Sequence, residues 1–400
     1  MAIIKPTLNL VASEYTPEII NTTRASGATR VNAVGLVERV SAGTLRYDYD
    51  PTTLAGKGWL VEEARTNILI QSEDLQTNWT AQNVGFGTKG TAPDGKTTAE
   101  LVDDSGGTTS NHSVYYSYSF TSGTSYTLSA WFKVGSGSHG WLQMPSSAFP
   151  GNISAEFDIT NLTSVDISDS GASAESITMV EYPNGWVRCS ITDTADATTS
   201  GNVQMGLNDG NGTTTVFTGS GLNMYMWGIQ LEAGAFPTSY IPTTTAAVTR
   251  SEDSVSVPLS DFDFNFNEQT IYLQSTATAF NGMAALAVYL NGSNTVSFFV
   301  NPTTTLRTHR QTSGLQGNLD FTKAAGIEFR AALSIAQDDV AFSVDGETPE
   351  LDTGHNMNST LTTVWLGSNG ATSPYSGYIS HVAIFNKAMS DADIQTITTG

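Results

Sequence analysis

Apolar and polar residues alternate with a period of two through much of the chain, which predicts β-strands. In residues 126–134 every second residue from Tyr126 to Val134 is apolar, and Gly123 and Gly135 supply the flanking turns. Similar runs, separated by segments rich in Gly, Asn, Asp and Ser, lie at 114–120, 140–144, 155–159, 177–182, 186–193, 203–207 and 222–231. About eight closely spaced strands without a long amphipathic helix predict an antiparallel sandwich or jelly roll.

The C-terminal part of the chain repeats this pattern and predicts a second sandwich. Its alternating runs lie at 270–277, 284–290, 295–300, 327–336, 339–344, 362–366 and 378–385. One short terminal helix is expected, because Ser390 and Asp393 form an S-x-x-D start before Ile394. The Thr- and Pro-rich stretch at 243–255 predicts a linker.

The first 66 residues, called the leader here, show no sustained period, so we expect extended or loosely organised structure there. The predicted fold is therefore all-β, with two antiparallel β-sandwich or jelly-roll domains after an extended N-terminal segment. The expected units are an attachment or oligomerisation segment at 1–66, a jelly roll at 67–245 and a second sandwich at 255–400.

Charge excludes several classes of function. The 400 residues include 17 Lys+Arg and 38 Asp+Glu, a formal net charge of -21, so the clustered basic residues that bind nucleic acid are missing. No apolar run approaches the ~20 residues that span a bilayer. Lys5 and Pro6 interrupt the first apolar residues, so a secretory signal is not expected. Cys189, the only cysteine, alternates with Val187 and Ile191 and is expected to be a small buried residue.

The charge is unevenly distributed. Residues 1–66 carry seven basic and seven acidic groups, residues 67–249 carry four and 16, and residues 250–400 carry six and 15. A neutral leader before two acidic blocks indicates either that the leader contacts another protein or that a short segment fluctuates in charge.

Several longer motifs resemble a known family. Residues 58–67 (GWLVEEARTN) and 227–243 (WGIQLEAGAFPTSYIPT), with Thr249 and Arg250, are similar to the carbohydrate-binding-like jelly-roll module of bacteriophage tail fibres and head spikes. Residues 24–30 and 46–50 resemble the leader that precedes this module in virion proteins. Residues 377–386 resemble the closing strand of a concanavalin A-like, laminin-G-type sandwich. The likeness covers nearly the whole chain.

This resemblance implies a non-enzymatic structural subunit of a phage or phage-like particle. Such a subunit is made in the host cytoplasm, assembles as a homo-oligomer with other virion structural proteins, and binds surface polysaccharide of a bacterial host. Two alternatives remain open: a capsid decoration protein without a glycan ligand, and a capsule depolymerase. A surface rich in Thr, Ser, Asn and Gly suits hydrogen bonding to sugar hydroxyls, and its acidic charge disfavours DNA.

Aromatic side chains are the candidates for sugar stacking. Trp141 follows a Gly- and Ser-rich turn beside His139, where its ring could form a platform. Trp131 and Tyr115 fall on the faces of their strands opposite the apolar residues, so they are expected to be exposed. Packing in a core remains the alternative for each. Trp186 and Trp227, by contrast, are expected in the core.

Acidic residues supply the candidates for metal binding and catalysis. Asp103 and Asp104 precede Ser-Gly-Gly and could hold a structural calcium ion, or they form an ordinary acidic turn; no other cofactor is expected. Glu156 and Asp158 alternate on one strand as the carboxylates of sandwich glycosidases do, but Asn161 stands near the place of a third carboxylate. We therefore expect no catalysis there.

Overall fold

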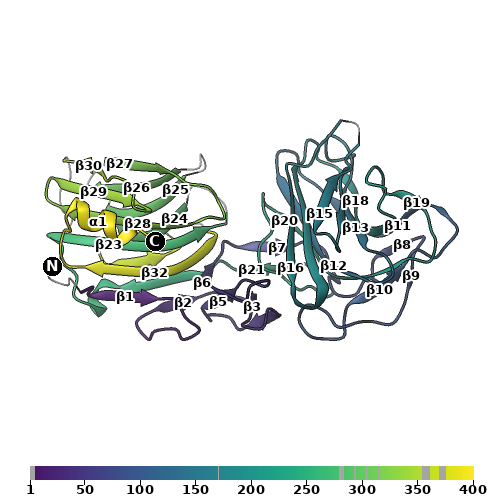
Figure 1. The fold of residues 1–400 in the computed structure, drawn as a ribbon, viewed down its shortest axis with the longest axis horizontal. Helices are drawn as coiled ribbons and strands as arrows, with labels where there is room; N and C mark the ends of the chain where they lie inside the picture. The colour runs from purple at the N-terminus through teal and green to yellow at the C-terminus, as the bar shows by residue number, and fades with distance from the viewer. Residues whose placement is uncertain are drawn as a thin grey trace.

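The structure is a computed structural model that describes residues 5–169, 171–278, 283–291, 294–301, 305–312, 315–353, 361–368 and 375–400. Strands dominate it, and its one α-helix, α1 (Asp391–Thr398), lies near the C-terminus. Two β-sandwiches lie side by side, and strands of the leader run beneath and between them (Figure 1). The predicted all-β class with two antiparallel sandwiches is confirmed. No helix in the described ranges is long and apolar enough to cross a membrane.

The middle sandwich consists of two antiparallel sheets, named here after their central strands. The β12 sheet has the order β16-β17-β12-β20-β10-β9, with strands Ser176–Tyr182, Trp186–Thr194, Ser125–Val134, Asn223–Ala233, Glu100–Asp103 and Gly85–Phe86. The β13 sheet has the order β15-β14-β13-β18-β11-β19, with strands Thr163–Asp166, Ile153–Asp158, His139–Met144, Ser200–Asn208, Thr109–Ser119 and Val216–Thr218, and β8 (Thr80–Gln82) also pairs with β11.

The core of the middle sandwich follows from the alternation in these strands. Leu128 and Phe132 of β12 face Leu142 and Phe157 of the opposite sheet, and all four are fully buried. Alternate residues must point to opposite faces of a strand, so each strand contributes one apolar row to the core. The eight strands predicted here all exist, with ends shifted by a few residues.

The C-terminal sandwich also consists of two antiparallel sheets. The β23 sheet has the order β30-β29-β28-β23-β32-β6-β5, with strands Glu350–Asp352, Asp339–Val344, Glu328–Ala336, Glu268–Ala277, Gly377–Phe385, Gly56–Val61 and Arg46–Tyr49, and β1 (Leu8–Val11) also pairs with β32. The β24 sheet has the order β2-β22-β31-β24-β25-β26-β27, with strands Asn21–Thr23, Ser254–Pro258, Thr363–Leu366, Met283–Asn291, Asn294–Asn301, Thr305–Thr312 and Leu315–Thr322.

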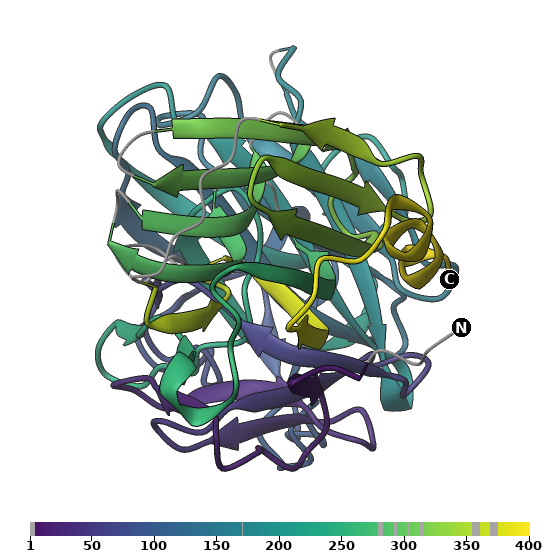
Figure 2. The same cartoon turned by 90° about the vertical axis from the view of Figure 1, so that its left-hand side faces the viewer.

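The leader is therefore part of the C-terminal sandwich, which differs from the loosely organised segment expected above. β1 pairs with the second half of β32, with Leu8 opposite Ile384, and β6 pairs with its first half, with Trp59 opposite Ile379. β2 pairs with β22 of the other sheet. Seen from this end, the leader strands close the lower edge of the sandwich (Figure 2). These strands have only three to six residues, too few to show a clear period, and β1 and β6 pair with a strand more than 300 positions away.

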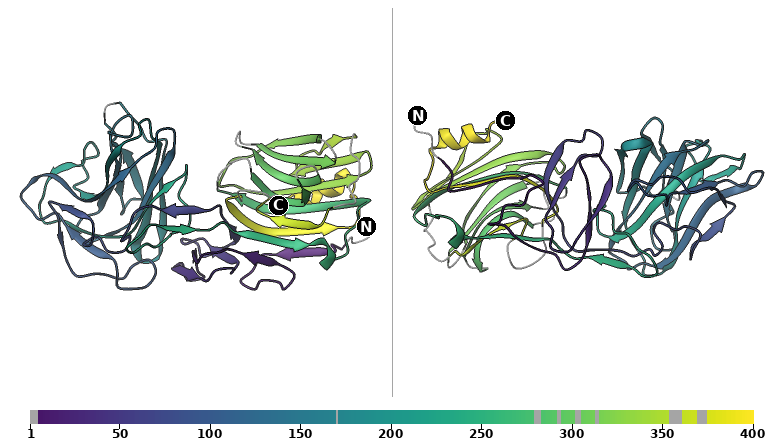
Figure 3. Two further views of the ribbon diagram at one scale, coloured as in Figure 1. Left: turned by 180° about the vertical axis from the view of Figure 1, so that it is seen from behind. Right: turned by 90° about the horizontal axis from the view of Figure 1, so that it is seen from below.

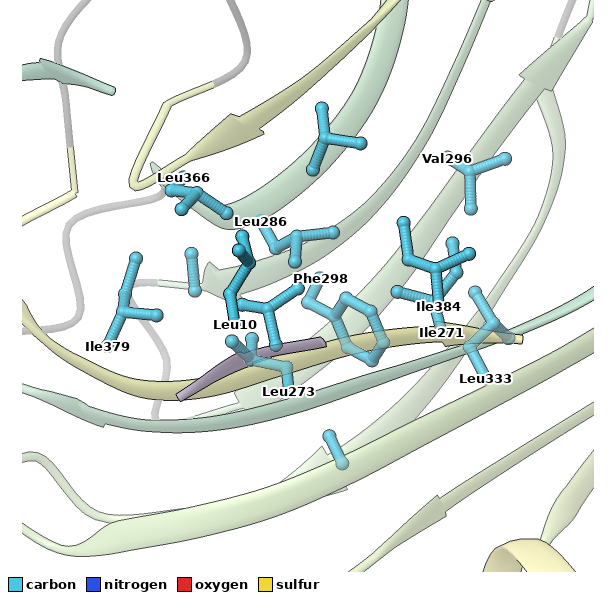
Figure 4. Close-up of a cluster of buried hydrophobic side chains, with 14 of the residues drawn as sticks. Leu10, Ile271, Leu273, Leu286, Val296, Phe298, Leu333, Leu366, Ile379 and Ile384 are labelled. Carbon is cyan, nitrogen blue, oxygen red and sulfur yellow. The ribbon is translucent and has the colours of Figure 1, made fainter. Parts of the chain in front are cut away.

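Leader and C-terminal residues share one hydrophobic core. Leu10 of β1 packs among Leu273, Leu286 and Ile384, and all of them are buried (Figure 4). Burying a Leu side chain stabilises a fold by about 1.5–3 kcal/mol, so the short leader strands have a reason to stay in place. On the outer face of the β23 sheet, α1 packs through Ile394, and the Ser390 side chain accepts the Asp393 N–H as the predicted cap.

The middle sandwich is inserted into the C-terminal one. The chain enters it along β7 (Arg65–Asn67) and leaves along β21 (Val248–Arg250), and these two strands pair antiparallel. The predicted linker at 243–255 is anchored at its start, since the buried Thr243 hydroxyl donates to the Leu69 carbonyl at 2.6 Å. Two adjacent strands, rather than one free linker, join the sandwiches.

Buried charges hold this junction together. Arg46 of β5 contacts both Glu62 and Asp253, the former at 2.7 Å, and Arg24 contacts Asp253 at 2.7 Å. Burial alone would raise the pKa of Glu62, but Arg250 and Arg46 outweigh burial and hold that pKa at about 2. Much of the leader's balanced charge is thus spent on ion pairs within the chain.

The leader also covers one face of the middle sandwich. The hairpin of β3 (Ala28–Val31) and β4 (Val37–Val40) packs Val31 and Val37 against the outer face of the β12 sheet. The Thr29 hydroxyl donates to the Tyr240 carbonyl at 2.6 Å. Viewed from below, these purple strands fill the space between the sandwiches (Figure 3).

Candidate functional site

A polar row of side chains crosses the outer face of the β13 sheet. Tyr115 of β11 stands opposite Gln204 of β18 on one side and Thr80 of β8 on the other. The neighbouring residues Val114 and Val203 point into the core. The outward residues are therefore those that alternation leaves free of core packing.

This row surrounds a shallow hollow of about 380 Å³ that is open to solvent. It is lined by three short strands' worth of neutral side chains: Ala81, Gln82, Asn111, Tyr115, Asn202 and Gln204. Every one of these residues except the exposed Ala81 is half-buried. An aromatic ring surrounded by amides offers an apolar face together with donors and acceptors, which is the combination that a sugar ring uses.

Two hydrogen bonds order the amides of the hollow. The Ser113 hydroxyl donates to Gln204 Oε1 at 3.1 Å, and the Thr215 hydroxyl donates to Asn111 Oδ1 at 2.9 Å. Each bond leaves the amide NH₂ of its Gln or Asn available. Within the described residues the Tyr115 hydroxyl has no hydrogen-bond partner, so the hollow presents both ring and hydroxyl to solvent.

Trp141, the first candidate for sugar stacking, is fully buried, and the expected platform is wrong. The indole lies against Gly206, where an added Cβ would come within 2.6 Å of the ring. Its Nε1 donates to the Leu207 carbonyl at 3.0 Å. The missing side chain at Gly206 makes room for the ring, so Trp141 fills the sheet surface instead of standing above it.

Trp131 is also fully buried, so the prediction of its exposure is wrong although its face was read correctly. The ring lies on the outer face of the β12 sheet, within 5.3 Å of the Trp227 ring. It packs with Val31 and Val37 of the leader hairpin. Gly228 makes the contact possible, since its φ of +68° and a Cβ position 2.8 Å from the ring both favour glycine.

Asp103 and Asp104 form a loop anchor rather than a calcium site. The Asp104 carboxylate is buried and accepts backbone N–H bonds from Gly106, Ser220, Gly221 and Leu222, and the pKa of Asp104 is lowered because these bonds outweigh its burial. Donors at all these positions repel a cation. Asp103 accepts the Ser105 N–H, and nowhere in the described ranges do three His, Cys, Asp or Glu side chains gather closely enough to hold a metal.

Glu156 and Asp158 share the outer face of β14. The buried Glu156 accepts bonds from Asn208 Nδ2 and from the Gly212 N–H, and burial raises its pKa. Asp158 accepts the side chain of Asn161 at 2.7 Å and lies 3.5 Å from His139. Both carboxylates therefore organise loops of this sheet.

The other aromatic and cysteine expectations are confirmed. Trp186 and Trp227 are buried, and Cys189 is buried with a pKa raised well above its usual value by that burial. The amides of the hollow were missed. Alternation in 203–207 marks residues 202 and 204 as outward-facing, but only the pairing of β18 with β11 brings them beside Tyr115.

No protein-family model matches this chain, and no curated protein matches it. Several solved structures are similar to part of it. The carbohydrate-binding module (CBM40) of the Ruminococcus gnavus IT-sialidase, bound to α2,3-sialyllactose, is 16% identical with a TM-score of 0.30 over 34% of this chain and 84% of that one.

Two further structures are similar at the same level. Domain 4 of the Geobacillus stearothermophilus arabinanase AbnA, in complex with arabinotriose, is 14% identical with a TM-score of 0.30 over 42% of this chain and 84% of that one. The SAP-like pentraxin of Limulus polyphemus is 16% identical with a TM-score of 0.28, over 33% and 70%. Likenesses this weak assign no function, so the argument below rests on the residues of this chain.

Proposed function

We propose that this protein binds glycans without cleaving them, through the hollow around Tyr115. The observation that carries the proposal is a half-buried tyrosine ring surrounded by the amides of Gln82, Asn111, Asn202 and Gln204. A charge-free lining in a chain of net charge -21 favours a neutral, hydroxyl-rich ligand over a cation. Sugar hydroxyls match the free donors and acceptors of amide groups.

We further propose that the protein is a fibre or spike subunit of a phage or phage-like particle. Its support is the sequence resemblance at 58–67 and 227–243 and in the leader. In this role the protein is made in the host cytoplasm, incorporated as a homo-oligomer with other virion proteins, and presents the hollow to host surface polysaccharide. Cryo-EM of particles labelled with an antibody to this protein tests the role; unlabelled particles would contradict it.

Substitution of Tyr115 by Ala tests the glycan site. Loss of a stacking ring removes about 0.5–1.5 kcal/mol beyond area burial, so adsorption to host cells should weaken roughly two- to tenfold. The melting temperature should change little, because the ring is half-exposed. Tyr15→Ala removes a ring that is 69% exposed in the leader and serves as the matched control. Unchanged adsorption by Tyr115→Ala would place any glycan contact elsewhere.

Two other measurements separate the alternatives. Purified protein incubated with host capsular polysaccharide should leave the chain length unchanged, whereas shortened chains would indicate a depolymerase and direct attention to Glu156 and Asp158. On a glycan array the wild-type protein should retain at least one host glycan. Retention of none would favour a decoration protein without a ligand.

A further inference from the structure

A second cavity lies where the leader, the middle sandwich and the C-terminal sandwich meet. Its volume is about 180 Å³, and its walls include Lys57 of β6, Trp131 of β12, Arg188 of β17 and Tyr378 of β32. A water molecule occupies about 30 Å³ in the liquid, so the cavity has room for a small organic molecule. It is separate from the hollow around Tyr115, and no lining residue is shared.

The acidic groups of this cavity already have partners. Glu62 is paired with Arg46 and also accepts the Ser239 hydroxyl at 2.6 Å. Asp48 accepts the Val31 N–H at 2.5 Å and the Tyr378 hydroxyl at 3.1 Å. Burial raises the pKa of Asp48 to about 6, which lessens its negative charge in mildly acidic solution.

Several donors, in contrast, lack acceptors. Trp131 Nε1 and Arg188 Nε are both buried with no hydrogen-bond partner. The Lys57 ammonium lies 4.0 Å from the centre of the Tyr378 ring and, among the described residues, forms no ion pair with a carboxylate. A buried donor without an acceptor costs free energy, so the set favours a ligand that brings acceptors.

Aromatic rings define the rest of the ligand's surroundings. Tyr182 and Tyr240 line the cavity beside Trp131, with ring centroids 5.7 and 5.2 Å from the Trp131 ring. The Arg188 guanidinium carbon lies 4.5 Å from the centre of the Trp131 ring. A ligand here therefore meets flat apolar surfaces as well as two cations, Lys57 and Arg188, that have no carboxylate partner.

We propose that this cavity binds a compact carboxylate carried on a small hydroxylated body, of the size and chemistry of a sugar acid. The carboxylate accepts from Lys57, Arg188 and Trp131 Nε1, and the body packs on the aromatic rings. Such a ligand touches all three parts of the chain and stabilises their arrangement by mass action. Its source is either an acidic residue of a glycan or a free small organic acid.

The test compares three probes on the full-length protein: glucuronate, glucose and acetate, each at the same concentration and ionic strength. Glucuronate should raise the melting temperature and give a saturable isotherm in titration calorimetry, while glucose should do neither. Acetate acting as strongly as glucuronate would support a free small acid as the ligand. No effect of any probe, or equal effects of glucuronate and glucose, would overturn the proposal.

Lys57→Gln locates the site. This substitution removes the ammonium but keeps a chain of similar length, and it should weaken glucuronate binding about tenfold or more, as expected for loss of a charge-assisted hydrogen bond. Lys96→Gln, at an exposed lysine outside the cavity, should bind as the wild-type protein does. Equal binding by both variants would show that glucuronate binds elsewhere. The comparison of probes on the wild-type protein remains decisive if Lys57→Gln fails to fold.

Discussion

The two sandwiches share an architecture but are assembled from the chain in opposite ways. The strands of both middle-sandwich sheets come from one uninterrupted stretch, from β8 at Thr80 to β20 at Ala233. The C-terminal sandwich combines leader strands with strands that follow Ser254. A local sandwich can form as soon as its own stretch is complete, whereas the other must bring together strands hundreds of residues apart. The leader is therefore as much a structural part of the C-terminal sandwich as it is a candidate attachment segment.

Removal of residues 1–66 should have the largest effect on this comparison. A fragment of residues 255–400 would lack β1, β2, β5 and β6 and leave the edge of β32 unpaired, so we expect it to remain unfolded. Its only tryptophan, Trp365, should then emit at the wavelength of a solvent-exposed indole. Residues 67–245 serve as the matched fragment and should give a cooperative β-type transition by circular dichroism. A folded 255–400 fragment would contradict the contribution of the leader.

Arg46→Met should produce the next largest effect. It leaves Glu62 and Asp253 as buried carboxylates with one cation fewer, and breaking a buried pair costs about 3–5 kcal/mol. Arg39→Met removes an exposed arginine that pairs with Glu73 at 3.1 Å and should cost at most about 1 kcal/mol. Urea unfolding of the full-length variants measures both. Equal losses would mean that the buried charges do not hold the junction.

A smaller effect should appear in the dependence of stability on pH. Asp48 has a folded pKa of about 6, above its ordinary value near 4, so the folded state binds the extra proton in that window. Stability from this group is therefore present at low pH and is lost as pH rises through about 6. The free energy of unfolding of the wild type relative to Asp48→Asn should fall by about 2 kcal/mol between roughly pH 4.5 and 7.5.

Glu62 should act in the opposite direction at lower pH. Its folded pKa of about 2 lies below the ordinary value, so its stabilisation is present above about pH 4.5 and is lost as pH falls toward 2. The isolated 67–245 fragment lacks both groups and serves as the control. A rise in the relative stability of wild type over Asp48→Asn between pH 4.5 and 7.5 would contradict the burial of Asp48.

The fold class was predictable because it depends on local periodicity. Strands such as β12 and β17 bury one apolar row over nine or more residues, and that row is visible in the sequence as alternation. β2 and β7, with three residues each, contain too few positions to show any period. Such strands are defined by their partners, which the sequence does not identify by position.

The candidate site divides in the same way. Alternation by itself determined that Trp131 and Tyr115 face away from the core of their sandwich. Whether that face meets water was decided by tertiary structure: the hairpin around Val31 covers Trp131, while no such cover lies over Tyr115. Strand parity is a property of neighbouring residues, whereas exposure depends on whatever distant segment packs on the same face, so only the folded chain could distinguish the two rings.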